Sequence, residues 1–241
     1  MPRKESDIYP YSVTDLSQKD AIVLAPHPDD ESFGCGGSIA RHTANGSRIK
    51  VIFLTDGDKG DFAGRFGKDY TRIRRNSAEK AMSILGVEDY EFWGYKDRGL
   101  HLKEEEVLEK LLNAIRTFSP SLIYAPSPYE AHPDHKITSR IAMKAFKKTG
   151  ITALFYEVLM ALSPGILVDI TPEIEKKKKA ACSYHTEISY NDYVEIVVGL
   201  NRFRSATLPG NVMYAEGFVL LDRDVPSDNN AVKLLSTVLD L

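Results

Sequence analysis

The chain contains only two cysteines, Cys35 and Cys182, in 241 residues. So few cysteines exclude a scaffold built on disulfides, and their wide separation excludes a CxxC motif for metal or redox chemistry. The chain also lacks an excess of positive charge, since 31 basic residues stand against 34 acidic ones and the net charge is −3. Proteins that bind nucleic acid through its phosphates need such an excess, so we expect no nucleic-acid partner.

Long apolar runs are missing as well. No uncharged apolar stretch approaches the roughly 18 residues that span a bilayer, and the first residues, MPRKESDIYPYSV, include no apolar core of a signal peptide. We therefore expect a cytoplasmic protein with no integral membrane segment. The sequence shows no repeat, low-complexity linker or break in composition, which predicts a single domain over residues 1–241. It leaves open whether the chain forms a homo-oligomer and what the tail after Asp224 does.

Strand-like and helix-like segments alternate along the chain. Apolar runs rich in β-forming residues occupy 21–25, 49–55, 90–93 and 122–125, and segments with helical periodicity lie at 36–43, 71–85, 104–118 and 134–148. Further along, the pattern predicts strands within 155–162, 166–170 and 215–221 and helices over 172–184 and 191–204, the first capped by Thr171. Short, continuously apolar strands that alternate with helices predict an α/β fold, with a Rossmann-like, mostly parallel sheet and helices on both faces.

Polar residues follow the first predicted strand directly. Ligands of parallel sheets bind at the carboxyl ends of the strands, and this strand runs into the turn Pro-His-Pro-Asp-Asp-Glu at residues 26–31. Two prolines restrict the turn, so its imidazole and carboxylates point in defined directions. Asp30 or Ser32 has an alternative use as the N-cap of the next helix. The run Gly34-Cys35-Gly36-Gly37 lacks the GxGxxG spacing of a nucleotide site, and we expect it to allow close packing of helix and sheet.

A second polar turn, His132-Pro133-Asp134-His135, follows the fourth predicted strand. If Pro133 is the first residue of the next helix, His132 and His135 lie three residues apart beside its N-terminus and can converge. Imidazoles and a carboxylate around an open position form the ligand set of a catalytic zinc. Two such turns at strand ends rarely arise by coincidence, so the sequence predicts a zinc site between them.

The paired motifs resemble the signature of the PIG-L/LmbE-like zinc-dependent deacetylases, which remove acetyl groups from N-acetylglucosaminyl compounds. The resemblance rests on Ala25-Pro-His-Pro-Asp-Asp-Glu31 together with His132-Pro-Asp-His135. Secondary matches occur at Thr55-Asp56-Gly57, Arg74, Tyr95, Asp97, Lys178, Glu216 and Phe218. The resemblance implies a Rossmann-like fold, a Zn²⁺ cofactor and a small-molecule amino-sugar substrate.

The resemblance also implies roles for single residues. The implied zinc ligands are His27, Asp30 and His135. Asp29 would be the general base, and His132 would stabilise the oxyanion of the tetrahedral intermediate.

Three further residues belong to this prediction. Arg74 and Asp97 match positions that hold the sugar in members of the family. Asp134 has two alternative roles. It accepts the free ring N–H of a histidine and so assists catalysis, or it is an acidic residue that stabilises the first turn of its helix.

The chain departs from the family pattern at three places. Ser77 stands where a glutamate often follows the family arginine by three residues, and Glu187-Ile188 stands where Ser-Gln is usual. A tyrosine that precedes the second motif in some members is replaced by Glu130, with Tyr129 one place away. These departures leave open the exact substrate and whether Tyr129 or Glu130 contributes to the oxyanion site.

The sequence thus favours a zinc-dependent hydrolase that removes an acetyl group from the amide nitrogen of an N-acetylglucosaminyl or related amino-sugar compound. One alternative is an amidase that cleaves a larger acyl group or conjugate. The other is a protein that binds the metal or the sugar without turnover.

Overall fold

Seven strands form one sheet in the computed structural model, which describes residues 12–224. The strands are β1 Ala21–Ala25, β2 Ile49–Thr55, β3 Asp89–Tyr95, β4 Leu122–Pro126, β5 Thr152–Tyr156, β6 Ile166–Asp169 and β7 Ala215–Leu221. The helices are α1 Asp30–Ala44, α2 Tyr70–Leu85, α3 Glu104–Phe118, α4 Pro133–Thr149, α5 Ile174–Ala181, α6 His185–Ile188 and α7 Tyr193–Arg204, with 3₁₀ turns at Gly67–Asp69, Leu100–Leu102 and Thr171–Glu173. Within the described range, none of the helices combines the length and apolar composition that a membrane crossing needs. The tail after Asp224 lies outside the described residues.

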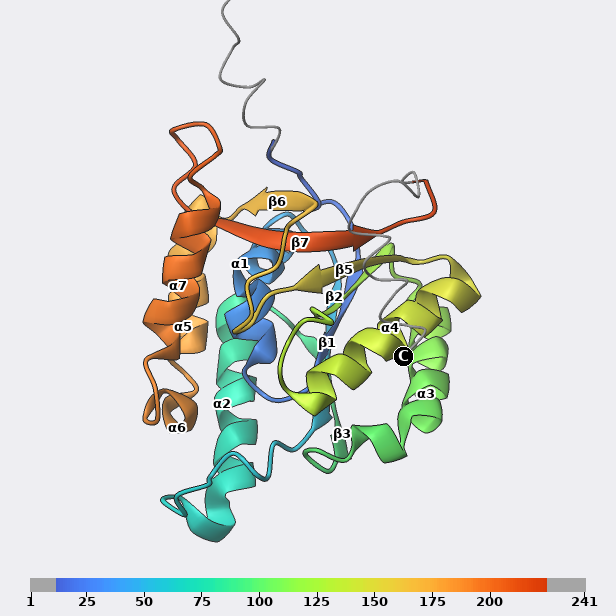
Figure 1. Ribbon diagram of the computed structural model, residues 1–241, viewed down its shortest axis with the longest axis vertical. Helices are drawn as coiled ribbons and strands as arrows, with labels where there is room; N and C mark the ends of the chain where they lie inside the picture. The colour runs from blue at the N-terminus through green and yellow to red at the C-terminus, as the bar shows by residue number, and fades with distance from the viewer. Residues whose placement is uncertain (1–11, 225–241) are drawn as a thin grey trace, which may run out of the picture.

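The strand order is β3-β2-β1-β4-β5-β7-β6. The first five strands are parallel, and β7 pairs antiparallel with both β5 and β6. Helices α1, α2, α5 and α7 cover one face of the sheet, and α3 and α4 cover the other (Figure 1). The predicted α/β fold with a Rossmann-like, mostly parallel sheet is confirmed.

Strand β1 shows why the central strands have continuous apolar sequences. Its five residues are all buried. Ala21, Val23 and Ala25 pack on the side of α1, while Ile22 and Leu24 pack on the side of α3 and α4. Because helices cover both faces, alternate side chains of one strand enter two different cores.

Helix α1 begins earlier than the sequence predicted. The helix expected at 36–43 starts at Asp30, and it has two parts joined at Cys35, whose φ of −137° is not helical. Only the second part has a visible helical period, because the first consists largely of polar side chains that are nevertheless buried. A Cβ on Gly34 would collide with the ring of Tyr156 in β5, so the predicted packing of the glycine run against the sheet is confirmed.

Helix α5 begins later than predicted. The helix expected at 172–184 starts at Ile174, after one 3₁₀ turn. Thr171 is not its N-cap. The Thr171 hydroxyl oxygen instead accepts the backbone N–H groups of Met213 and Tyr214 at 2.8 and 3.1 Å, so a contact with a distant segment takes the place of the local cap.

The break in α1 is braced by a buried ion pair. Glu216 of β7 accepts hydrogen bonds from the backbone N–H groups of Gly37 and Ser38 at 2.9 and 2.8 Å and from the Lys177 ammonium group at 2.6 Å. Lys177 and Glu216 are 0% and 1% exposed. The carboxylate thus satisfies the donors that the break leaves free and holds α1 to α5 and β7.

We expect Glu216→Ala to lower the free energy of unfolding by about 3–5 kcal/mol, because it leaves a buried ammonium group without a partner. Urea unfolding of the variant measures this loss. Glu216→Ala combined with Lys177→Met removes both charges and should recover much of it. A loss below about 1 kcal/mol, the value of an exposed pair, would contradict the bracing role.

The buried side chain of His42, in the second part of α1, should make the protein less stable in acid. The side chain is buried, and its Nε2 lies 2.9 Å from the Tyr124 hydroxyl. Burial lowers the pKa of His42 to about 4 from an ordinary value of 6.5. Between these values the unfolded chain binds the proton and the folded chain does not, so stability falls as the pH falls from 6.5 to 4.

The His42 contribution should reach a loss of about 3 kcal/mol near pH 4. His42→Gln has no titrating group, so its stability should fall less steeply over the same interval. The measurement is the free energy of unfolding of both proteins against pH. Parallel curves would show that His42 does not carry this part of the acid response.

Candidate active site

A cleft of about 610 Å³ opens at the carboxyl ends of the parallel strands. The turns that follow β1, β2, β3, β4 and β5 all contribute to its wall, as does the segment from α6 to α7. Strands β1 and β4 are neighbours in the sheet, so the two polar turns that follow them meet at the floor of the cleft.

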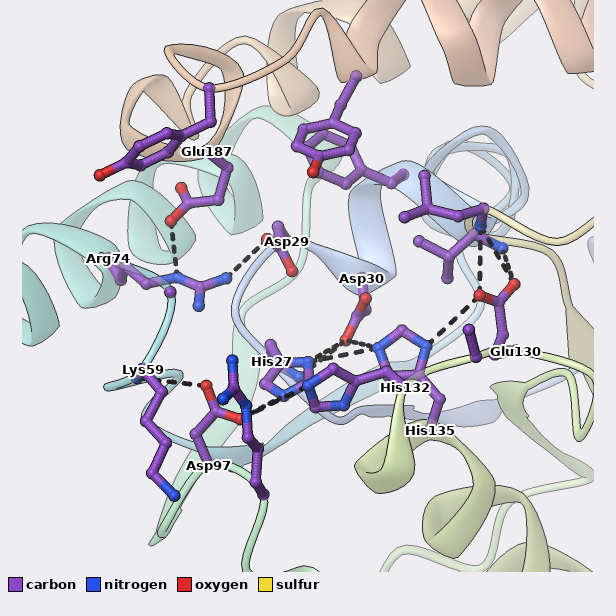
Figure 2. A pocket seen from close by; sticks show the side chains of 18 of the residues that line it. His27, Asp29, Asp30, Lys59, Arg74, Asp97, Glu130, His132, His135 and Glu187 are labelled. Carbon is purple, nitrogen blue, oxygen red and sulfur yellow. Dashed lines mark hydrogen bonds and ion pairs between the residues drawn. The ribbon is translucent and has the colours of Figure 1, made fainter. Parts of the chain in front are cut away.

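His27, Asp30 and His135 converge on one point (Figure 2). Nδ1 of His27 lies 3.1 Å from Oδ2 of Asp30, and Nε2 of His135 lies 3.2 Å from the same oxygen and 3.3 Å from Nδ1 of His27. A tetrahedral zinc with bonds of about 2.0–2.1 Å holds neighbouring ligand atoms about 3.3 Å apart. The three atoms therefore have the spacing of one face of a zinc site.

The two nitrogens of His27 face different groups. Nε2 lies 3.4 Å from Oδ1 of Asp97 and 3.5 Å from Oδ2 of Asp134, on the side away from Asp30. Although burial opposes the change, the Asp134, Asp30 and Asp97 carboxylates raise the pKa of His27 well above its ordinary value. Carboxylates behind a ligand imidazole fix its tautomer and strengthen its binding to a metal. Asp134 also stands in the first turn of α4, so its position is compatible with both roles predicted for it.

Other combinations of these side chains also come close enough to hold an ion. The ligand atoms of His27, His132 and His135 lie within 4.8 Å of one another, as do those of His27, Asp97, His132 and Asp134. The predicted set that includes Asp30 has shorter separations, 3.1 to 3.3 Å. We therefore take it as the better fit to zinc.

Glu130 stands behind His135 in the same way. Its carboxylate accepts the backbone N–H groups of Val158 and Met160, and its Oε2 lies 3.8 Å from Nδ1 of His135. The segment after β5 therefore holds the Glu130 carboxylate beside the His135 ring, in the wall of the cleft and beyond hydrogen-bond distance of Nδ1. Tyr129 packs against the α3–α4 core and is not among the residues that line the cleft.

Asp29 sits on a strained backbone beside the three converging side chains. Its φ is 147°, a region that side chains other than glycine rarely occupy and that costs about 1–3 kcal/mol. Its carboxylate lines the cleft and accepts a hydrogen bond from Nη2 of Arg74 at 2.6 Å. Burial raises the pKa of Asp29 well above its ordinary value, and the Arg74 guanidinium opposes that rise. Strain of this kind is typical of functional positions.

Arg74 reaches the cleft wall, but its donors are directed at the protein. The side chain is 3% exposed and donates to the carbonyl oxygens of Pro28 and Gly57 as well as to Asp29. Asp97 also lines the cleft, and its Oδ2 accepts the backbone N–H of Lys59. Sugar binding by Arg74 and Asp97 stays a prediction.

His132 is the N-cap of α4, with Pro133 in the first helical turn as the sequence predicted. Nδ1 of His132 accepts the backbone N–H of Asp134 at 3.2 Å, so a neutral ring carries its proton on Nε2. Burial and the charges of His27 and His135 lower the pKa of His132 to about 4. The side chain is thus a neutral donor at the edge of the cleft.

Aromatic side chains line the outer part of the cleft. Phe62 is 77% exposed, and its ring centroid lies 4.3 Å from that of Tyr190. The Tyr190 hydroxyl donates to Asp61 at 2.7 Å, and Asp61 also accepts three backbone N–H groups of its own loop. Phe33 and Tyr193 extend this surface inward. The loop between β2 and α2 therefore holds an exposed ring in a fixed place.

Sequence reasoning did not find several residues that support the site. Glu187 faces Arg74, and the Tyr184 hydroxyl donates to Glu31 at 2.6 Å. Within the lysine run of α5 the buried residue is Lys177, whereas the family match at Lys178 pairs with Glu175 near the surface. These are polar residues in helices without a recognisable motif, and only the folded chain brings them to the site.

Comparison with known proteins finds similarity to deacetylases. The sequence profile of the family described as PIG-L, GlcNAc-PI de-N-acetylase, matches residues 22–146. A diacetylchitobiose deacetylase of Thermococcus kodakarensis is 28% identical over 188 residues, which are 70% of this chain and 70% of that protein. A probable N-acetyl-alpha-D-glucosaminyl L-malate deacetylase 2 of Bacillus anthracis is 29% identical over 54% of this chain and 60% of its own length.

A solved structure is similar over a longer part of the chain. The crystal structure of the conserved protein TT1542 from Thermus thermophilus superposes with a TM-score of 0.73 and 30% sequence identity. The match covers 88% of this chain and 99% of that one, so it extends beyond residues 22–146.

Proposed function

Because the chain belongs to the PIG-L family of GlcNAc-PI de-N-acetylases, we propose that it hydrolyses the acetamide of an N-acetylglucosaminyl or related amino-sugar compound with the aid of zinc. The observation that carries this proposal is the convergence of His27, Asp30 and His135 beside the Asp29 carboxylate. The relatives named as deacetylases of diacetylchitobiose and of an N-acetylglucosaminyl malate support the amino-sugar class.

His27, Asp30 and His135 would hold the zinc ion, since two imidazoles and a carboxylate form one of its usual catalytic ligand sets. When bound there, zinc supplies a Lewis acid that makes water more acidic and polarises an amide carbonyl. Asp134 and Glu130 would keep the two histidine rings in place from behind.

Asp29 would carry the protons of the reaction. It stands next to a ligand without being needed as one, so its carboxylate is free to take a proton from the attacking water. The same group then returns that proton to the nitrogen of the departing amine. His132 would donate from Nε2 to the oxyanion of the tetrahedral intermediate, a contact typically worth about 3–4 kcal/mol.

The cleft suggests a substrate larger than a free sugar. A volume of about 610 Å³ lies within the range that encloses drug-sized ligands. An amino sugar would lie at the floor of this cleft, and a group attached to that sugar would lie along Phe62 and Tyr190, which line the same cleft. We therefore propose that the natural substrate is a conjugate of the amino sugar.

A panel assay tests the proposal. The zinc-loaded protein is incubated with N-acetylglucosamine, N,N′-diacetylchitobiose, amino sugars that carry longer acyl groups, and a simple acetamide without a sugar. Release of a primary amine and of acetate is measured. We expect the acetylated sugars to be cleaved and the simple acetamide to be a poor substrate.

Equal cleavage of the simple acetamide, or preference for longer acyl groups, favours the amidase alternative. Zinc and sugar binding without cleavage of any compound favours the binding protein.

A further inference from the structure

A chain of polar contacts leads from α6 to the Asp29 carboxylate. Glu187 lies at the end of α6, and its Oε1 is 3.0 Å from Nε of Arg74. A second nitrogen of the same guanidinium, Nη2, donates to Oδ2 of Asp29 at 2.6 Å. Figure 2 shows Arg74 between the two carboxylates. Oε1 of Glu187 also accepts the Tyr70 hydroxyl at 2.9 Å, so this carboxylate has a fixed place of its own.

The Arg74 guanidinium, which links the Glu187 and Asp29 carboxylates, has little freedom to move. Arg74 is 3% exposed and Glu187 is 8% exposed. Besides Asp29, Arg74 holds the carbonyl oxygens of Pro28 and Gly57 at 2.7 and 3.2 Å. A planar guanidinium that contacts four acceptors has a fixed orientation, and it has few N–H groups left for a sugar.

Asp29 is a residue that needs such support. Its backbone has φ 147°, and its own N–H is held by Oε2 of Glu31 at 3.2 Å. A strained backbone returns to a relaxed conformation unless neighbouring contacts prevent it. Arg74 contacts both the peptide before Asp29 and the Asp29 side chain, so it resists this relaxation at two points.

We propose that Glu187 is a positioning residue: it orients Arg74, which in turn fixes the Asp29 carboxylate toward the cleft. This inference rests on the proposed function, because it takes Asp29 as the base of the deacetylation. It also gives Arg74 a different role: Arg74 holds the base in place and does not hold the sugar. Glu187 lies beyond residues 22–146, the part of the chain that the family profile matches.

Positioning and sugar contact predict different kinetics. A residue that fixes the base acts on the chemical step, so its loss lowers kcat and leaves KM nearly unchanged. A residue that holds the sugar equally well in ground state and transition state affects KM instead. A displacement of about 1 Å at a reacting group can cost about 10²-fold in rate.

The test compares Glu187→Ala, Glu187→Gln and the control Glu195→Ala, which changes an exposed carboxylate on α7. Kinetics on N,N′-diacetylchitobiose, zinc content and thermal unfolding are measured for each protein. We expect Glu187→Ala to lower kcat by about 10- to 100-fold with KM within about twofold and zinc content unchanged. Glu187→Gln should retain most activity, because its amide oxygen still accepts from Tyr70 and stays beside Nε of Arg74. The control should match the wild type.

Arg74→Lys provides a second route if Glu187→Ala does not fold. Lysine keeps the buried charge, but a point charge cannot hold Asp29, Pro28 and Glu187 together. The same loss of kcat with little change in KM is expected.

A double variant tests the coupling between Glu187 and Asp29. Because Glu187 acts through Arg74 on Asp29, adding Glu187→Ala to Asp29→Asn should change the residual rate less than twofold. A full additional loss in the double variant, or an increase in KM alone for Glu187→Ala, would overturn the positioning role. An active wild type with unchanged kcat in Glu187→Ala overturns it as well. A wild type that releases no amine or acetate from any sugar overturns the proposed function itself, and with it this inference.

Discussion

We expect Asp29→Asn to lower kcat for deacetylation by about 10²- to 10⁴-fold, the usual contribution of a general acid or base, which is the role proposed for Asp29. Asparagine has the shape of aspartate, tolerates unusual backbone conformations and still accepts a hydrogen bond from Arg74 through its amide oxygen. It cannot take a proton from water near neutral pH. Zinc content should therefore remain at the wild-type level, and steady-state kinetics on an acetylated amino sugar measure the loss.

Asp69→Asn is a matched control for this variant, because its carboxylate is 66% exposed and pairs only with Arg72 on the surface. Its kcat should equal that of the wild type. Unchanged kcat in Asp29→Asn would mean that another group moves the proton. Glu31 is a poor replacement, because its Oε1 accepts the Ser32 and Tyr184 hydroxyls inside the protein. Asp134 is fully buried behind His27, so it would need a chain of water molecules to act.

We expect His135→Ala to lose the zinc ion that the proposed site would hold. The variant should weaken zinc binding by more than about 100-fold, because even groups behind the ligands contribute 10- to 100-fold and a ligand contributes more. We expect wild-type protein to retain about one zinc per chain after dialysis and His135→Ala to retain less than about a tenth of that. Elemental analysis and competition with a chromophoric chelator provide the measurement. His101→Ala, which removes an exposed imidazole, is the control.

Two of the candidate ligand sets around His27, one with Asp30 and one with Asp97, give opposite results in a further pair of variants. If zinc lies between His27 and His135, Asp30→Ala loses the metal and Asp97→Ala largely keeps it. If the ion lies on the Nε2 side of His27, Asp97→Ala loses it and Asp30→Ala keeps it. Full occupancy in both His27→Ala and His135→Ala would contradict the proposed ligands altogether.

The motifs at the floor of the cleft could be predicted from the sequence because each one is local. Residues 26–31 and His132 to His135 both follow apolar strands, and a parallel sheet brings such turns to one edge. Pro133 in the first turn of α4 is a local signal as well, and it placed His132 and His135 on the correct side of the helix.

The residues that support the site from distant parts of the sequence could not be predicted in this way. Glu187 contacts Arg74 across more than a hundred residues, and Glu216 reaches Ser38 across 178. Glu216 matches a family position in the sequence and Glu187 departs from one, but their neighbours in the sequence do not show which partners will bury them. The unusual φ of Asp29 also has no sequence signal, since an aspartate in a turn normally indicates a cap or a bend.

The backbone at Asp29 has a consequence for how related chains can be judged. Glycine is the residue that adopts a φ of 147° without steric cost, so folding alone would select glycine at this position. A protein of this fold that no longer catalysed a reaction would not need the charge opposite Arg74. Replacing the aspartate at position 29 with glycine would then make that protein more stable. Under the proposed function, aspartate is kept at position 29 for turnover at a cost in stability, and we expect glycine there in chains of this fold that bind a ligand without turnover.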